Sequence, residues 1–348
     1  MRQTRKLDHI RGALSLPDGP LTTGFADISL IHNALPETDL AEIDTGRSVF
    51  GCQLEIPVLV NAITGGNPQV TEINRALARA AKAAGFGVAV GSQTGALLEP
   101  ELAATFEVVR SENPTGLVIA NVGASIKPEQ ALQAIEMVQA NALQVHLNVA
   151  QELAMPEGDR NFRGMAENIR QLVKLSPVPV IVKEVGFGLS KEVAVRLCDL
   201  GVQWVDIGGA GGTNFVAIEH LRGGKSTVPE DWGIPTAVSL LEVLAGCPQL
   251  SVIASGGIRS APDAVKALVI GADLVGIAGL WLRTLLSESY GELEERLTKL
   301  KQEIRTIMLL LGTKRIAELR YQPLVISGKT REWVNERGVD STKWAKRD

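Results

Sequence analysis

The stretch Ala142-Leu143-Gln144-Val145-His146-Leu147-Asn148 is a short apolar run that ends in polar side chains. Side chains alternate between the two faces of a strand, so His146 and Asn148 point the same way. Gln151 and Glu152 follow the run, and we expect them in a loop. A strand end with an imidazole, two carboxamides and a carboxylate is typical of an anion site with a divalent metal. The imidazole and amides would donate to phosphate oxygens, and the carboxylate would hold Mg²⁺.

Further runs of the same aliphatic and β-branched composition recur along the chain, at 57–63, 87–92, 117–123, 179–185, 204–209, 252–257 and 274–279. Their nearly continuous apolar character is that of parallel strands buried on both faces. Segments with helical spacing lie between them, at 71–84, 127–140, 164–174, 191–200, 236–245 and 261–270. Eight strands alternating with helices predict an α/β fold, the (β/α)8 TIM-type barrel. A doubly wound open sheet is disfavoured because no GxGxxG follows the first strand.

The barrel pattern divides the chain into three parts. We expect an N-terminal extension over 1–56, a catalytic barrel over 57–312 and a C-terminal tail over 313–348 that packs on the barrel. The span 214–233 is longer than an ordinary βα loop and is interpreted as an insertion or lid. The charged, amphipathic stretch 282–312 predicts one long last helix.

Charge and cysteine content limit the classes of partner. The formal net charge is −4, which does not favour nucleic acid or an anionic membrane. No apolar stretch reaches the ~20 residues that span a membrane, and the basic start lacks the apolar centre of a signal peptide. The three cysteines, Cys52, Cys198 and Cys247, are scattered and odd in number. We therefore expect a cytoplasmic protein with reduced thiols rather than a disulfide framework or a zinc site.

Glycine-rich strand ends indicate a phosphate site. Barrels often bind phosphate between the loops after strands 7 and 8, where backbone N–H groups and a helix N-terminus meet. Gly256-Gly257 and Ala278-Gly279 follow those strands, and Arg259 adds charge. Glycines that merely turn corners are the alternative. Two such ends on adjacent strands, together with the glycine run 208–212, favour a ligand.

Lys183 ends a buried strand, where an unpaired ammonium is costly. It could form a Schiff base, pair with Glu184, or face the electron-rich edge of a flavin. The amide-bearing strand ends at Asn61, Gln93 and Asn121 favour the flavin. By contrast, His32, His220 and Glu219 lack such neighbours and are assigned ordinary packing or surface roles.

Motifs along nearly the whole chain match one known family. They are Arg5-Lys6-x-x-His9, Ala34-Leu35-Pro36-Glu37, Asn61-Ala62-Ile63-Thr64-Gly65-Gly66, Gly91-Ser92-Gln93, the heptad 146–152, Gly211-Gly212-Thr213-Asn214-Phe215, Ser255-Gly256-Gly257-Ile258-Arg259 and Leu324-Val325-Ile326-Ser327-Gly328. On these motifs the chain resembles the type 2, FMN-dependent isopentenyl-diphosphate delta-isomerase family. The heptad and the N-terminal motif are the most specific, whereas the element at 255–259 is shared by many FMN barrels.

The resemblance implies a role for each matching residue. FMN would be held by Ala62, Ile63, Thr64, Ser92, Asn121, Lys183, Thr213, Gly257, Arg259, Ala278 and Gly279. The substrate diphosphate would be held by Arg5, Lys6, His9, His146, Asn148 and Gln151. Glu152 would bind Mg²⁺. The family usually has Arg where this chain has Thr94, and some members have Ser or Thr where it has Val185, so we expect an altered substrate affinity.

The implied reaction converts isopentenyl diphosphate to dimethylallyl diphosphate, with one proton added to the terminal alkene carbon and one removed from C2. Reduced FMN would supply and accept these protons, and NADPH would reduce the flavin. No residue is singled out as a certain protein acid or base. The resemblance also implies a homo-oligomer, a tetramer or an octamer.

Three other activities are alternatives to the isomerase. A hydroxy-acid oxidase on the same FMN barrel would need a late histidine, and no histidine follows His220. An inosine-monophosphate dehydrogenase would need a cysteine after strand 6, and residues 210–216 contain none. A Schiff-base aldolase would use Lys183. A non-catalytic flavin-binding barrel remains the reading that Thr94 encourages.

Overall fold

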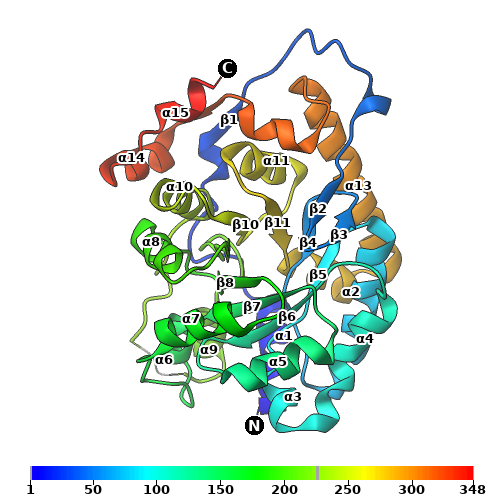
Figure 1. Ribbon diagram of the computed structural model, residues 1–348, viewed down its shortest axis with the longest axis vertical. Coiled ribbons are helices and arrows are strands. Elements are labelled where there is room, and N and C mark those ends of the chain that lie inside the picture. Colours follow the sequence, from blue (N-terminus) through cyan, green and yellow to red (C-terminus); the bar gives the residue numbers. More distant parts are fainter. Residues whose placement is uncertain (1, 225–226, 348) are drawn as a thin grey trace.

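The computed structural model describes residues 2–224 and 227–347. Eight parallel strands form a closed barrel in the order β10-β11-β4-β5-β6-β7-β8-β9 (Figure 1). Their bounds are β4 Val58–Val60, β5 Gly87–Ala89, β6 Val118–Gly123, β7 Ala142–Leu147, β8 Val180–Glu184, β9 Trp204–Asp206, β10 Ser251–Ser255 and β11 Leu274–Ile277. Every strand predicted from an apolar run is present, and the barrel fold is confirmed.

Helices follow the strands and cover the barrel. They are α2 Thr71–Ala84, α3 Thr94–Leu98, α4 Ala104–Glu112, α5 Pro128–Met137, α6 Val149–Ala154, α7 Met165–Leu175, α8 Lys191–Asp199, α9 Phe215–Leu221, α10 Thr236–Gly246, α11 Ala261–Ile270, α12 Gly279–Ser287 and α13 Tyr290–Leu310. Local signals explain the helix ends. The Ser260 side chain accepts from Asp263 N at the start of α11, and Gly85 closes α2 with a φ of 71°.

The barrel interior is packed below the cavity. Leu59, Ile119, Ile181 and Ile253 belong to one buried cluster inside the strands. The hairpin of β2 (Arg47–Val49) and β3 (Cys52–Leu54) contributes Val49 and Leu54 to the same cluster. Because these apolar side chains close one end of the barrel, a ligand can enter only at the other end, where the strands have their carboxyl ends.

The two end segments of the chain meet on the outside of the barrel. Strand β1 (Ile28–Leu30) pairs antiparallel with β12 (Leu324–Ile326). The tail continues through α14 (Gly328–Glu336) and α15 (Thr342–Ala345), where Trp344 donates to the carbonyl of Ile270 at 2.8 Å. Short 3-10 turns complete the chain at Phe25–Asp27, Leu40–Glu42, Pro68–Val70, Pro100–Leu102 and Ile316–Tyr321.

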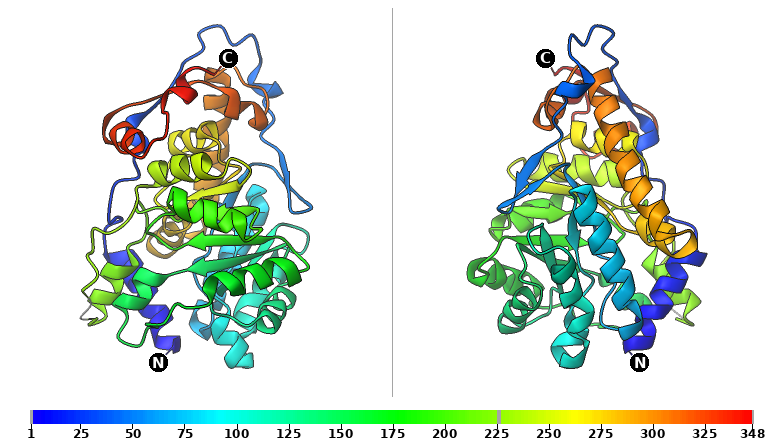
Figure 2. Two further views of the ribbon diagram at one scale, coloured as in Figure 1. Left: turned by 60° about the vertical axis from the view of Figure 1, so that its left-hand side comes forward. Right: turned by 90° about the vertical axis from the view of Figure 1, so that its right-hand side faces the viewer.

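Two local expectations are wrong, the single helix over 282–312 and the loop at Gln151 and Glu152. The stretch 282–312 forms parts of two helices, because Ser289 caps α13 by accepting from Glu292 N at 3.1 Å; α13 then runs beside α2 on the outside of the barrel (Figure 2). The basic N-terminus is a helix, α1 (Arg2–Ser15), which packs against α9 and α12. Gln151 and Glu152 lie on α6 rather than in a loop.

The span interpreted as a lid holds α9 and a following loop. Lys225 of its Gly-Gly-Lys element lies outside the described residues. Across 2–224 and 227–347, no helix combines the length and apolar character of a membrane span.

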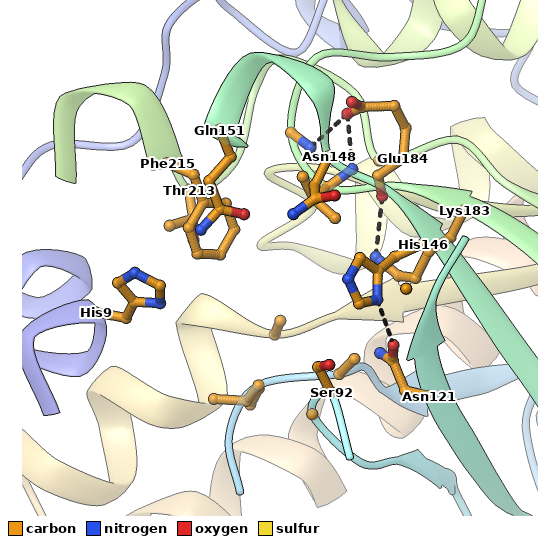
Figure 3. A pocket seen from close by; sticks show the side chains of 18 of the residues that line it. His9, Ser92, Asn121, His146, Asn148, Gln151, Lys183, Glu184, Thr213 and Phe215 are labelled. Carbon is orange, nitrogen blue, oxygen red and sulfur yellow. Dashed lines mark hydrogen bonds between the residues drawn. The ribbon is translucent and has the colours of Figure 1, made fainter. Parts of the chain in front are cut away.

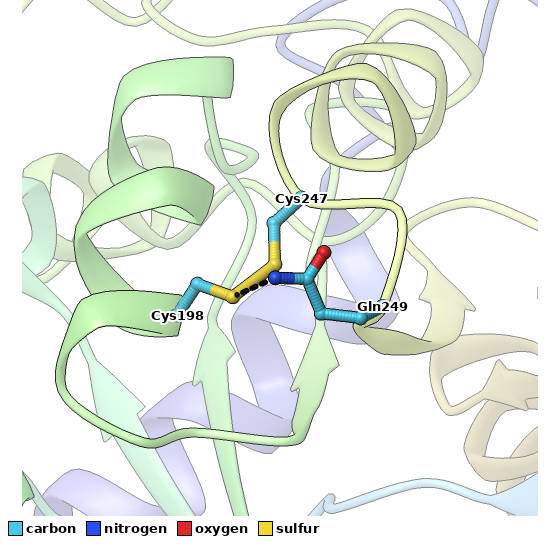
Figure 4. The surroundings of a disulfide bond; sticks show 3 residues. All are labelled: Cys198, Cys247 and Gln249. Carbon is cyan, nitrogen blue, oxygen red and sulfur yellow. Dashed lines mark hydrogen bonds between the residues drawn. A yellow bond between two sulfur atoms is a disulfide. The ribbon is translucent and has the colours of Figure 1, made fainter.

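The expectation of unpaired cysteines is also wrong. Cys198 at the end of α8 and Cys247 after α10 form a disulfide, with their Cα atoms 6.6 Å apart (Figure 4). Gln249 donates to Cys198 Sγ at 3.0 Å. Widely spaced cysteines in the sequence are brought together because α8 and α10 are neighbours on the barrel surface.

The disulfide makes a countable prediction. Protein purified without reductant and then denatured should show one free thiol, Cys52, and three after treatment with dithiothreitol. The bond joins residues 49 apart in the sequence, so loop-closure entropy assigns it roughly 4 kcal/mol of unfolding free energy. A Cys198→Ser protein is the control and should be insensitive to reductant. Three thiols without reductant would contradict the pairing.

Candidate active site

One cavity of about 870 Å³ opens at the carboxyl ends of the barrel strands. It is lined by every residue to which the family resemblance assigns substrate, flavin or metal. These are Arg5, Lys6, His9, Ala62, Ile63, Thr64, Ser92, Asn121, His146, Asn148, Gln151, Glu152, Lys183, Thr213, Gly257, Arg259, Ala278 and Gly279. In Figure 3, His9 and Gln151 lie on one side of the cavity, and His146 and Lys183 lie on the other side.

Helix α1 supplies the cationic side of the cavity. His9 Nε2 lies 2.7 Å from Glu219 Oε1, and Gln151 donates to the same oxygen at 3.3 Å. Glu219 is fully buried and also pairs with Arg222. From the sequence, Glu219 was expected to have an ordinary role. The missed signal was its place on a helix that begins at the end of the motif at 211–215, which brings an acid behind His9 and Gln151.

Burial and mutual repulsion set the protonation of this region. Burial, together with Arg5, lowers the pKa of Lys6 to about 8. Burial lowers the pKa of His9 despite the opposing effect of Glu219. Burial and the cations Lys183, Lys6 and Arg5 lower the pKa of His146 to about 3. Near neutral pH the His146 ring is therefore uncharged, and the positive charge of the cavity comes from lysine and arginine side chains.

Glu152 is held at the edge of the cavity. Its Oε1 accepts from Asn148 Nδ2 and its Oε2 accepts from Asp159 N, both at 2.8 Å. The described ranges contain no cluster of three or more acidic, histidine or cysteine side chains that could hold a metal. A lone carboxylate suits Mg²⁺, which keeps several waters and takes further oxygens from substrate phosphates. The residues present therefore fit Mg²⁺ only together with a phosphate ligand.

Lys183 does not pair with the carboxylate of Glu184, the one protein partner proposed for it. Its ammonium donates to the carbonyl of Glu184 at 2.9 Å and lies 3.9 Å from Asp206 Oδ2. The Glu184 carboxylate instead accepts from the backbone N–H groups of residues 185–187. Asp206 was not predicted from the sequence, although an acid inside the apolar run 204–209 was the available signal.

Gln93 was expected on the rim of the flavin, but its side chain does not line the cavity. Its side chain is fully buried. It donates to the carbonyl of Ala134 at 2.8 Å and accepts from the backbone N–H of Asn121 at 2.9 Å. Gln93 thus holds β6 and α5 together, whereas Asn61 and Asn121 do line the cavity.

The opposite side of the cavity fits FMN. The Thr64 hydroxyl is buried without a hydrogen-bond partner in the described chain, so it can serve a bound ring. Gly257 has a φ of 81°, and a Cβ there would lie 1.8 Å from the Gly211 carbonyl oxygen. Only glycine allows this close backbone turn. At Gly279, where α12 begins, the backbone N–H groups can receive phosphate.

Two arginines and one acid surround this phosphate cradle. Arg259 Nε donates to Asp18 Oδ2 at 2.7 Å, and Arg283 pairs with the same oxygen. Arg283 also lies close to Gly279, since a Cβ there would be 3.3 Å from its terminal nitrogen. Neither Asp18 nor Arg283 was predicted, because the N-terminal segment meets α12 only in the folded chain.

Comparison with known proteins places this site in a class. Residues 118–326 match the family described as FMN-dependent dehydrogenase. In structure, the chain is similar to a lactate oxidase of Pediococcus acidilactici, with a TM-score of 0.69 at 18% identity over 92% of this chain and 90% of the other. It is similar also to a mandelate oxidase crystallised with benzoyl-formic acid, with a TM-score of 0.67 at 19% identity, covering 92% and 94%. The barrel is thus that of the FMN-dependent enzymes.

Sequence relatives narrow the class. The isopentenyl-diphosphate delta-isomerase of Symbiobacterium thermophilum is 47% identical, with 100% of this chain and 99% of that protein covered. The isomerase of a Geobacillus strain is 46% identical, with 98% of both covered, and that of Listeria monocytogenes serotype 4b is 41% identical, with 100% and 98% covered. The chain belongs to the isopentenyl-diphosphate delta-isomerase family.

Asp18 predicts a measurable competition. Its carboxylate occupies the two arginines that a flavin phosphate would use, so Asp18→Asn should tighten FMN binding to the apoprotein. A partly exposed ion pair contributes about 1 kcal/mol, which corresponds to roughly fivefold in Kd. Quenching of flavin fluorescence would measure the change. Glu72→Gln, which removes a surface acid paired with Arg75, is the control, and weaker binding by the Asp18 variant would contradict the competition.

Glu184 predicts a pH-dependent stability. Burial raises its pKa from 4.5 to about 7 although three backbone N–H groups oppose the shift. A raised carboxyl pKa favours the folded state below about pH 4.5, and that contribution is lost as pH rises through about 7. From pH 4.5 to 8, wild type should lose about 3 kcal/mol of unfolding free energy relative to Glu184→Gln. Parallel urea denaturation curves across this pH range would disprove the shift.

Proposed function

We propose that this chain is an isopentenyl-diphosphate delta-isomerase that interconverts isopentenyl diphosphate and dimethylallyl diphosphate for isoprenoid synthesis. The observation that carries the proposal is the joining, in one cavity, of a cationic pocket and a flavin-sized cradle. Arg5, Lys6 and His146 line the first part of the cavity, and Thr64 and Gly257 line the second. A diphosphate bound by the cations leaves its short hydrocarbon over the flavin.

Each residue of the pocket has a task in this reaction. Arg5, Lys6 and His9 bind the diphosphate, and Glu219 orients His9 and Gln151 through its 2.7 and 3.3 Å contacts. His146 and Asn148 complete the diphosphate site on the strand side. Glu152 would hold Mg²⁺, which would offset the negative charge of the diphosphate.

The flavin side is held by the remaining strand ends. Reduced FMN, when bound, supplies the acid and the base for the two proton transfers, and NADPH is its reductant. Lys183 presents a positive charge to the flavin ring. The carboxylate of Asp206, 3.9 Å from the ammonium, is its counter-charge. Helix α1, packed on α9 and α12, covers the cavity and keeps water from the reacting alkene.

The proposal extends to the setting of the enzyme. We assign it to the cytoplasm, as a homo-oligomer, a tetramer or an octamer, without nucleic-acid or membrane partners. The division into an extension (1–56), a catalytic barrel (57–312) and a tail (313–348) belongs to the same proposal. The pairing of β1 with β12 supports treating the extension and the tail as one covering layer.

An anaerobic assay tests the function. Protein reconstituted with FMN, reduced, and supplied with Mg²⁺ and isopentenyl diphosphate should release dimethylallyl diphosphate. Absence of product while the flavin is bound and reduced would sink the proposal. Stoichiometric oxidation of the substrate by the flavin would instead favour an oxidoreductase.

Glu152 predicts the metal dependence of that assay. Glu152→Gln removes the charge that holds Mg²⁺, so kcat/KM should fall about 100-fold or more and lose its response to Mg²⁺. FMN absorbance should be unchanged, because Glu152 lies on the diphosphate side. The control is Glu167→Gln on α7, which removes an exposed acid paired with Arg170. Loss of FMN in the Glu152 variant would show that its role has been misplaced.

A further inference from the structure

Buried side chains form a continuous polar chain beneath the cavity, from Asp206 on β9 to His146 on β7. Asp206 and Gln144 are fully buried, and Asn61 and Asn121 are each 4% exposed. The only ring nitrogen of His146 with a hydrogen-bond partner in the described chain is Nδ1, which lies 2.8 Å from Asn121 Oδ1 (Figure 3). Nε2 is left to the cavity.

The Asp206 carboxylate sets the direction of this chain. Asn61 Nδ2 and Gln144 Nε2 approach its Oδ2 at 2.8 and 3.2 Å, and Ser255 donates to its Oδ1. Lys183 lies 3.9 Å from Oδ2. Because an ionised carboxylate only accepts hydrogen bonds, both amides must turn their NH₂ groups toward it.

The orientation of each amide then dictates the next. Asn61 Oδ1 accepts from the backbone N–H of Ala62 at 2.9 Å and from Gln144 Nε2 at 3.0 Å. With its NH₂ committed, Gln144 turns Oε1 to Asn121, whose Nδ2 lies 3.4 Å away. Asn121 therefore turns its own Oδ1 to His146. A carbonyl oxygen accepts, so the hydrogen in the His146–Asn121 contact belongs to Nδ1.

We propose that Asp206, acting through Gln144 and Asn121, holds His146 as the Nδ1–H tautomer, so that Nε2 faces the cavity as a hydrogen-bond acceptor. Asp206, Gln144 and Asn121 are positioning residues in this arrangement. The hydrogen bond on one ring nitrogen decides what the other can do. From the sequence, the imidazole was expected to donate a hydrogen bond to phosphate. In the proposed tautomer its Nε2 accepts one instead.

The tautomer selects the state of the ligand; this step rests on the proposed function. A neutral ring with a lone pair at Nε2 repels a fully ionised phosphate oxygen and accepts from a protonated one. The charged groups that lower the pKa of the ring are cations, Lys183 on β8 and Lys6 and Arg5 on α1. We infer that the site takes the diphosphate with one hydrogen on the phosphate that meets His146.

The tautomer is observable without a bound diphosphate. Long-range ¹H–¹⁵N spectra of the isotopically labelled flavoprotein distinguish Nδ1–H from Nε2–H rings, and His146→Gln assigns the signal among the four histidines. Wild type should show an unprotonated Nε2 at neutral pH. An Nε2–H ring in wild type would overturn the proposal.

Two variants test the chain itself. Gln144→Met keeps the length of the side chain but breaks the link to Asp206, and Asn121→Ser removes the carbonyl beside Nδ1. Each should raise the Nε2–H population severalfold in protein whose cooperative unfolding shows that it is folded. The second variant serves if the buried methionine prevents folding. An unchanged Nδ1–H ring in a folded variant would show that Asp206 does not set the tautomer.

Inorganic pyrophosphate tests the ligand state. Calorimetric titration near pH 8 in two buffers with different ionisation enthalpies should show more net proton uptake by wild type than by His146→Gln. The difference between the two proteins is the readout, because Lys6, whose pKa is about 8, takes up protons in both. His146→Gln should also bind more weakly. Equal uptake by the two proteins overturns the inferred ligand state alone. Failure of pyrophosphate to bind at all contradicts the proposed function, while the ligand-free spectra still decide the tautomer.

Discussion

Closure of the parallel sheet is the constraint on which the cavity depends. Strand β11 pairs with β4 in the register Val275↔Val58, which joins the last strand of the barrel to the first. The strand end at residues 61–64 then lies beside the glycine end at 276–279. Gly276 makes room for this junction, since a Cβ there would lie 2.5 Å from Asn61 Nδ2. Without closure, Thr64 after β4 and Gly279 after β11 would lie at opposite edges of an open sheet.

Closure also buries polar groups, and the interior satisfies them collectively. A carboxylate in a low-dielectric interior is tolerated only when donors surround it. Asp206 has Asn61, Gln144 and Ser255 as donors, with Lys183 nearby. In such networks each hydrogen bond fixes the orientation of its neighbour. The hydrogen bonds that stabilise the buried Asp206 therefore also decide which amide atoms, donor or acceptor, face His146.

The barrel is shared with hydroxy-acid oxidases, but the chemistry belongs to the rim. Lactate and mandelate oxidases have the same fold at under 25% identity. In this chain the cationic helix α1 lies over the strand ends, where it contacts α9 and α12. Its Arg5 and Lys6, with the buried Glu219 behind His9, make an anion pocket beside a flavin site.

The sequence alone determined the barrel and most of the rim. Continuous aliphatic runs that alternate with helical segments are typical of buried parallel strands, and residues at the carboxyl ends of such strands converge, so 146–152 and 255–259 were expected at one end of the barrel. The partners of those residues required the tertiary structure. Asp18 with Arg283, and Cys198 with Cys247, are contacts between segments far apart in the chain, where neither periodicity nor motif carries information. The order of donors and acceptors from Asp206 to His146 likewise exists only when the strands bring these side chains into one interior, because the orientation of each amide is set by the group that it faces.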